Sequence, residues 1–137
     1  MIVPVDYVAV LVATIVAFVI GGLWYSPLVL GKQWMKLRGM DPVSMQGMQF
    51  PTWLMVQEFI TTLIMAFVIA QFAAWVGAYG LVAGLVLGLW LWLGFVATVM
   101  YSATVWEKYP LGLFVINAGL RLVNILVMAA IIAWWPW

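Results

Sequence analysis

The stretch LGLFVINAGLRLVNILVMAAIIAWW, residues 111–135, decides the fold class of this chain. Its single charged residue is Arg121, and most of the other residues are apolar. A helix needs roughly 20 apolar residues to cross the hydrocarbon core of a bilayer, and this run is long enough. Three further runs of the same kind occupy residues 5–24, 52–75 and 80–101. The pattern predicts an all-α polytopic membrane protein, a single domain over 1–137 whose four transmembrane helices form a bundle.

The composition supports this class and excludes several functions. Of the 137 residues, 69% are hydrophobic and 7% charged, whereas about a quarter of the residues in a soluble domain are charged. The net charge of +1 provides no basic field for phosphates, so we expect no nucleic-acid partner. The sequence has no histidine and no cysteine, the usual ligands of zinc, haem and iron–sulfur clusters. We therefore expect no metal and no other cofactor.

Catalysis is not expected either. Glu58 is the only carboxylate well inside a predicted span, and a carboxylate cluster for metal-assisted chemistry is missing. Without histidine or cysteine the chain lacks the common bases and nucleophiles, and Ser26 and Ser102 have no obvious activating partner. We predict no catalytic residues and a protein that is not an enzyme.

Basic residues predict the orientation of the chain. Apart from Arg121, lysine and arginine fall in two loops, a long one over 26–50 and a short one before the last run. These residues are Lys32, Lys36, Arg38 and Lys108. Cytoplasmic loops carry an excess of such residues, so we place both loops in the cytoplasm and both termini outside. The first run begins with Asp6 rather than with a basic segment, so we expect a retained helix and not a cleaved signal.

Within the long loop, GKQWMKLRGM (31–40) mixes basic residues with the apolar Trp34, Met35 and Leu37. This mixture is typical of a short helix that lies on anionic headgroups. A solvated loop with a few basic residues is the alternative interpretation.

Small residues recur at every fourth position in two of the predicted helices. They are Ala9, Ala13, Ala17 and Gly21 in the first helix, and Gly80, Gly84 and Gly88 in the third. This spacing lets helix backbones approach closely in lipid and predicts helix–helix seams. Such a seam can join the first and third helices of one chain or join two chains. Besides the lipid bilayer, we expect a homo-oligomer or a partner in a membrane complex.

Polar residues gather in the predicted cytoplasmic half. Asn117, Arg121 and Asn124 stand at i, i+4 and i+7, which places them on one face of the last helix. Glu58 and Thr62 lie in the second predicted helix, and Tyr101 and Ser102 stand at the end of the third. Counting along the helices puts Glu58 about 9 Å and Arg121 about 15 Å from the cytoplasmic ends. We predict that these two side chains pair, and that Asn117, Asn124, Thr62 or water accept further hydrogen bonds from the guanidinium.

Two interpretations of this polar group remain open. In the first, the pair and its amides only fix the packing of the second and fourth helices. In the second, the group forms a pocket that opens to the cytoplasm and binds or transports a small solute or a lipid headgroup. A non-catalytic structural or assembly subunit is the alternative function.

Short motifs resemble those of a known family. Trp24-Tyr25-Ser26-Pro27 is followed by Gly31 and by Trp34-Met35, and Asn117-Ala118-Gly119 stands early in the last run. These motifs resemble the family called domain of unknown function 1761, although Leu30 replaces an aromatic residue before the glycine. The resemblance implies a small four-helix membrane protein of the bacterial inner membrane and no particular activity. From the residues alone, we interpret the first motif as a helix stop with aromatic anchors, because Pro27 ends a helix.

Overall fold

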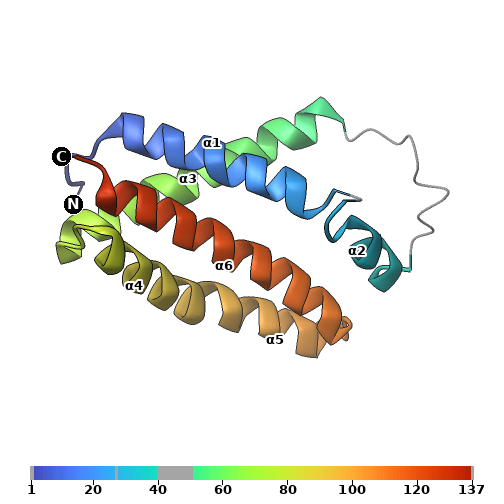
Figure 1. Cartoon of the computed structure of the whole chain (residues 1–137). Helices are drawn as coiled ribbons and strands as arrows, with labels where there is room; N and C mark the ends of the chain where they lie inside the picture. Colours follow the sequence, from blue (N-terminus) through green and yellow to red (C-terminus); the bar gives the residue numbers. More distant parts are fainter. Residues whose placement is uncertain (1, 27, 40–50, 137) are drawn as a thin grey trace.

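The computed structural model describes residues 2–26, 28–39 and 51–136, and every regular element in these ranges is helical (Figure 1). The elements are α1 (Tyr7–Trp24), α2 (Gly31–Leu37), α3 (Thr52–Val76), α4 (Leu81–Trp92), the π-helical turn η1 (Leu93–Ala97), α5 (Thr98–Glu107) and α6 (Leu111–Trp134). Helices α1, α3 and α6 are each long and apolar enough to cross a membrane. Helix α4, η1 and α5 together form one more such span, which is the third in chain order. The predicted all-α membrane fold is confirmed.

Helix ends follow from local chemistry. The Asp6 carboxylate caps α1, because its Oδ1 accepts hydrogen bonds from the backbone N–H groups of Val8 and Ala9 at 2.8 and 3.2 Å. Pro51 and Pro110 directly precede α3 and α6, where a missing N–H does no harm.

The third span was predicted to end at residue 101, but it continues to Glu107. No breaker interrupts residues 102–107, and the helix stops only where Lys108 adopts a left-handed conformation.

Helix α6 lies at the centre of the bundle. It packs against α1, α3 and α4, and α1 also packs against α3. Within the described residues α3 makes few contacts with α4 and hardly touches α5. Both termini lie at one end of the bundle, while α2 lies at the other (Figure 1). We call these the terminal end and the α2 end; which of them faces the cytoplasm stays a prediction.

The apolar core occupies the terminal half. Its buried side chains come from the first half of α1 and the later halves of α3 and α6, and they include Val10, Ala13, Ala66, Ile69, Ala70, Met128 and Ile132. Polar contacts tie the N-terminal segment to this core. The Gln71 side chain exchanges two hydrogen bonds with the backbone of Val3, at 2.8 and 2.9 Å. The Trp135 indole donates to Asp6 Oδ2 at 3.1 Å.

The small residues form close contacts, but not all in the predicted way. A Cβ atom on Gly84 would lie 2.5 Å from the carbonyl oxygen of Ala129 in α6, and one on Gly88 would lie 3.2 Å from the Cβ of Ala129. Ala13 and Ala17 are fully buried where α1 meets its neighbours. The first and third spans therefore do not form one joint seam, since within the described residues each packs mainly against a common neighbour, α6.

The two outermost glycines of these series are not seam residues. Gly80 precedes α4 with a φ of 94°, a conformation that favours glycine, and its N–H donates to the carbonyl oxygen of Ala133 at 2.7 Å. Gly21 has open space where a Cβ would be, so close approach along α1 has ended before this position.

Each series of small residues continues, four positions on, into a large aromatic residue. Tyr25 follows Gly21 at this spacing, and Trp92 follows Gly88. The Trp92 indole donates to the carbonyl oxygen of Ala118 at 2.9 Å, and the Tyr25 hydroxyl donates to Asn117 Oδ1 at 2.6 Å. Both aromatic side chains thus meet α6 at the same level.

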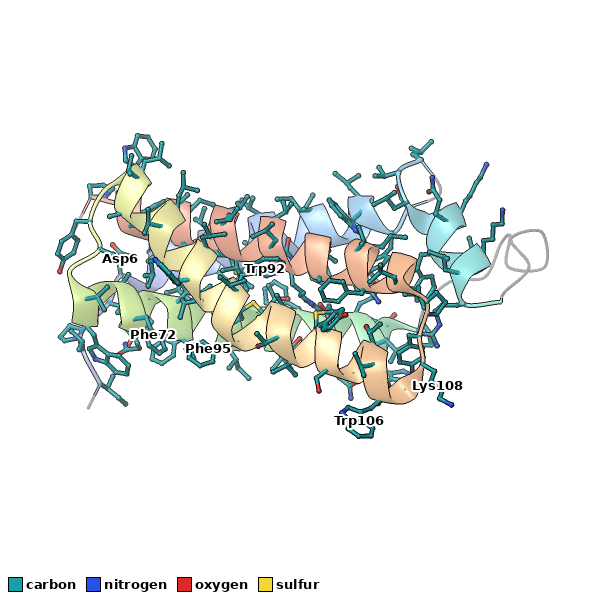
Figure 2. All side chains as sticks on the ribbon, turned by 90° about the horizontal axis from the view of Figure 1, so that it is seen from below. Asp6, Phe72, Trp92, Phe95, Trp106 and Lys108 are labelled. Carbon is teal, nitrogen blue, oxygen red and sulfur yellow. The ribbon has the colours of Figure 1, made fainter. Side chains whose placement is uncertain are left out.

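Beyond this level the third span packs less closely against α6. The π-helical turn η1 follows Trp92 directly, and such a turn shifts the side chains that come after it to a new face. Every residue of α5 is at least partly exposed. Figure 2 shows Trp92 between Asp6 at the terminal end and Lys108 at the other, with Phe95 and Trp106 on the outer surface of the span. The α2 half is consequently the more open half.

Candidate functional site: an ion pair in the open half of the bundle

The predicted pairing of Arg121 with Glu58 is present. Arg121 Nη1 lies 3.2 Å from Glu58 Oε1 and joins α6 to α3. The surroundings differ from those of a sealed core, because the side chains of Arg121 and Glu58 are 31% and 49% exposed. An ion pair at this position in two membrane-spanning helices is open to whatever lies beside the protein.

The threonines next to Glu58 support its helix and not the guanidinium. The hydroxyls of Thr61 and Thr62 both donate to the backbone carbonyl oxygen of Glu58, at 2.9 and 2.7 Å. Thr62 is buried, so this contact satisfies its hydroxyl inside the bundle. Within the described residues, Thr62 therefore does not supply the additional acceptor that the sequence suggested for Arg121.

The asparagines also have other roles than expected. Asn117 Oδ1 accepts the Tyr25 hydroxyl, and Asn124 is buried with its Oδ1 unpartnered within the described residues. Among these residues the guanidinium of Arg121 donates to Glu58 alone. A guanidinium has more N–H donors than a single carboxylate oxygen can occupy, so Arg121 retains donor capacity.

Tyr25 belongs to the same polar group. It follows the end of α1, where the Trp24 indole donates to the carbonyl oxygen of Ile116 at 3.0 Å and its ring lies against Gly119. Burial raises the pKa of the Tyr25 phenol, while the charge of Arg121 lowers this pKa and that of Glu58 raises it. Because both charges act on the phenol, we define the polar cluster as Tyr25, Glu58, Asn117 and Arg121.

The motif around Tyr25 does more than stop a helix. A Cβ atom on Gly31 would collide with the carbonyl oxygen of Tyr25, so only glycine allows α2 to approach the end of α1 this closely. The Trp34 ring packs edge-on against the Tyr25 ring, with 5.6 Å between the centroids. Pro27 lies outside the described residues. The motif thereby docks α2 and orients the Tyr25 hydroxyl towards α6.

The predicted short helix in the long loop is present as α2. Lys32 and Lys36 are exposed, as expected for a basic surface. Trp34 and Leu37, however, contact the protein itself: Trp34 meets Tyr25, and the Leu37 side chain lies where a Cβ on Gly112 would be. Part of the apolar side of α2 is thus used to hold the helix on the bundle.

Tyr101 and Ser102 lie on α5 and are exposed. The Tyr101 ring packs edge-on against Phe114 of α6, with 5.4 Å between the centroids. Within the described residues no hydrogen bond or ion pair connects either side chain to Glu58 or Arg121. Their assignment to a ligand site stays a prediction.

The sequence interpretation did not include Tyr25 and Trp92 among the site residues. Both follow a series of small residues at an unchanged four-residue spacing, and both carry a polar group on an apolar ring. A change from glycine to such an aromatic residue, along one helix face, is the signal that identifies them.

Together these features define a polytopic α-helical membrane protein with a polar cluster in the more open half of its bundle. The model of the family described as "Protein of unknown function (DUF1761)" matches residues 8–133. The chain therefore belongs to this family, as the motifs around Tyr25 and Asn117 suggested. No curated protein and no solved structure matches the chain.

Proposed function

We propose that the polar cluster binds a small anionic group, a phosphate or a carboxylate, carried by a solute or by a lipid headgroup. The observation that carries this proposal is the state of Arg121. Within the described residues its guanidinium donates to Glu58 only, and 31% of the side chain is exposed. A cation inside a membrane span is expensive to keep and commonly marks a ligand or ion path.

Glu58 can release Arg121 when an anion binds to the guanidinium. Its carboxylate pairs with Arg121 and neutralises it, and its exposure of 49% leaves room for the side chain to move aside. Arginine binds phosphate and carboxylate through paired N–H donors, which a carboxylate held by one oxygen does not saturate. The proposed function is reversible binding without a covalent step, and it therefore includes no enzymatic activity.

The proposed ligand reaches the cluster from the side of the bundle. Within the described residues α3 hardly touches α5, and Glu58 on α3 and Arg121 on α6 are both accessible. With both termini outside, the cluster lies in the cytoplasmic half of the inner membrane of a bacterium. The basic residues of α2 and Lys108 lie at this same end and favour the approach of anions.

The test is the thermal unfolding of the full chain in mild detergent. We expect the melting temperature to rise saturably with sodium phosphate or with a small carboxylate such as acetate, compared with sodium chloride at equal ionic strength. The double variant Glu58→Gln/Arg121→Gln should lose this response while it remains folded. The matched control Lys108→Gln, an exposed cation outside the cluster, should keep it. An identical response in both variants contradicts the proposal.

A second candidate, an assembly subunit, is favoured by the exposure of the third span. Of the most apolar 18 residues in this span, 17% are buried, compared with 44% in α6. A second copy of the chain packed on the outer face of this span would cover this surface. The mass of the protein in lipid nanodiscs, measured by light scattering, distinguishes the two cases: a monomer there argues against assembly.

A further inference from the structure

A hollow separate from the ion pair lies at the α2 end, between α5 and α6. It is partly open and has a volume of about 170 Å³, and its walls include Arg38, Met100, Thr104, Tyr109, Phe114 and Asn117. We call it the interfacial hollow. A closed cavity of ~150 Å³ is large enough for a benzene ring, so the hollow accommodates a chain segment or a small headgroup and not a bulky solute.

The charged side chain of the hollow, Arg38, stands at its surface end, while the deeper wall combines apolar side chains with Thr104 and Asn117. Arg38 directly follows α2, and Tyr109 lies in the turn between α5 and α6, so both stand at the α2 end of the molecule. Met100 lies two helical turns before the end of α5, about 10 Å further towards the middle of the bundle. A cation at the surface end and apolar side chains such as Met100 further in suit an amphiphile whose headgroup lies at the membrane surface and whose chain lies deeper.

Arg38 is oriented within this arrangement. Its guanidinium carbon lies 5.2 Å from the centroid of the Trp34 ring, a cation–π contact. Trp34 is itself held against Tyr25 by the docking of α2. Within the described residues Arg38 forms no ion pair, so its N–H donors remain free for an external phosphate.

The charges around the hollow select for an anion. Lys32 and Lys36 are exposed on α2, and Lys108 is exposed beside Tyr109. Among the described residues at this end, Glu107 is the one carboxylate outside the ion pair. Clusters of basic residues next to a membrane attract anionic lipids.

We infer that the interfacial hollow binds one anionic phospholipid, whose phosphate lies on Arg38 and whose glycerol and upper chain lie against Met100 and Phe114. A free phosphate ion would use Arg38 but leave the apolar wall without a partner. A zwitterionic lipid would fill the wall but gain less from the surrounding lysines. The inference does not depend on ligand binding at Arg121.

The experiment measures how the melting temperature of the full chain depends on phosphatidylglycerol in mixed micelles with phosphatidylcholine. We expect saturable stabilisation of the wild type. In Arg38→Gln the apparent affinity should fall about tenfold, which corresponds to about 1.4 kcal/mol. The matched control Lys32→Gln removes an equal charge from α2 outside the hollow and should lower the apparent affinity much less than Arg38→Gln does.

A second variant tests the apolar wall without a change of charge. Ala103→Phe places a ring into the hollow from α5, a helix whose residues are all partly exposed and which therefore tolerates a larger side chain. This variant should also lose the saturable response to phosphatidylglycerol. The variant Glu58→Gln/Arg121→Gln should keep it, so a failure of the polar-cluster proposal and a failure of this one give different results.

Two outcomes overturn the inference. If Arg38→Gln and Lys32→Gln weaken the response equally, the lipid is attracted only by the general surface charge. If inorganic phosphate stabilises the Glu58→Gln/Arg121→Gln variant as well as phosphatidylglycerol does, the hollow binds a free anion and not a lipid.

Discussion

The two halves of the bundle are built differently from the same helices. At the terminal end, Gly84 and Gly88 bring α4 against α6, and Ala13 and Ala17 are fully buried. At the α2 end, every residue of α5 is at least partly exposed, and the Glu58–Arg121 pair is open to the surroundings. The change occurs where aromatic side chains from α1 and from the third span meet α6.

This difference shows how a small membrane protein separates stability from a binding site. Helices in lipid gain little from burying apolar surface, so close backbone approach through small residues provides much of the association energy. Tyr25 and Trp92 end that approach and fill the space with rings whose polar groups satisfy α6. The half beyond them is held by fewer contacts and is therefore better suited to open for a ligand.

The largest expected change in stability comes from a methyl group added on the terminal side of Trp92. The same addition on the other side of Trp92 serves as the control. In Gly84→Ala the new Cβ would lie 2.5 Å from the Ala129 carbonyl oxygen and 2.7 Å from the Ala133 Cβ, neither of which can rotate away. Overpacking of this kind costs about 1–3 kcal/mol. We expect a loss in the upper part of that range, measured as the free energy of unfolding in mild detergent.

The matched control is Gly94→Ala in the same span. Nothing lies within 4 Å of a Cβ at this position, in the π-helical turn. This variant should be as stable as the wild type or slightly more stable, because alanine restricts the unfolded chain. Equal destabilisation by both substitutions would show that the two halves are packed alike.

The second test removes one partner of the ion pair. Within the described residues Glu58 is the one partner of Arg121, so Glu58→Gln leaves this cation unpaired inside a membrane span. We expect the free energy of unfolding to fall by about 1–2 kcal/mol. The loss should stay below the ~3–5 kcal/mol of a fully buried pair, since both side chains are partly exposed. Thermal unfolding in detergent measures it.

The double variant Glu58→Gln/Arg121→Gln controls for this effect. It removes both charges, so it should recover most of the lost stability. A double variant that is as unstable as Glu58→Gln alone would mean that the pair itself is not what stabilises the contact between α3 and α6.

Most of the fold follows from the sequence. The four apolar runs, the cap at Asp6 and the prolines before α3 and α6 locate the spans, because these signals are local. The extension of the third span to Glu107 and the π-helical turn at Leu93–Ala97 were missed. The extension carries polar residues at a helix end. The turn directly follows Trp92, which bonds to α6, and no local pattern in the apolar run marks its position.

The candidate site follows only in part. A single deep carboxylate and a single deep cation have few alternatives, so the pair of Glu58 and Arg121 could be predicted. The bond from Tyr25 to Asn117 was not anticipated, because it joins the ends of the first and last spans and depends on the docking of α2. The exposure of Arg121 also depends on the separation of α5 from α3, which no local pattern indicates.

The smallest expected effect concerns Tyr25, which connects the two halves. Tyr25→Phe keeps the ring against Trp34 but removes the hydroxyl that donates to Asn117. A hydrogen bond of this kind contributes about 1 kcal/mol, so we expect a loss of that size at neutral pH. The free energy of unfolding in detergent, compared between the variant and the wild type, measures it.

The pH dependence of this difference gives a sharper test. Burial raises the pKa of the folded Tyr25 above its ordinary value of 10.0, so the folded protein holds the phenol proton more tightly than the unfolded chain does. As the pH rises above that value, the unfolded state loses its proton first and becomes relatively more stable. The advantage of the wild type over Tyr25→Phe should therefore be complete below about pH 10 and should decrease as the pH approaches the folded pKa. The other tyrosines and all lysines are common to both proteins, so their titration cancels in the comparison. Parallel stability curves for the two proteins through this range would show that the phenol is not buried, and that the boundary between the closed and open halves lies elsewhere.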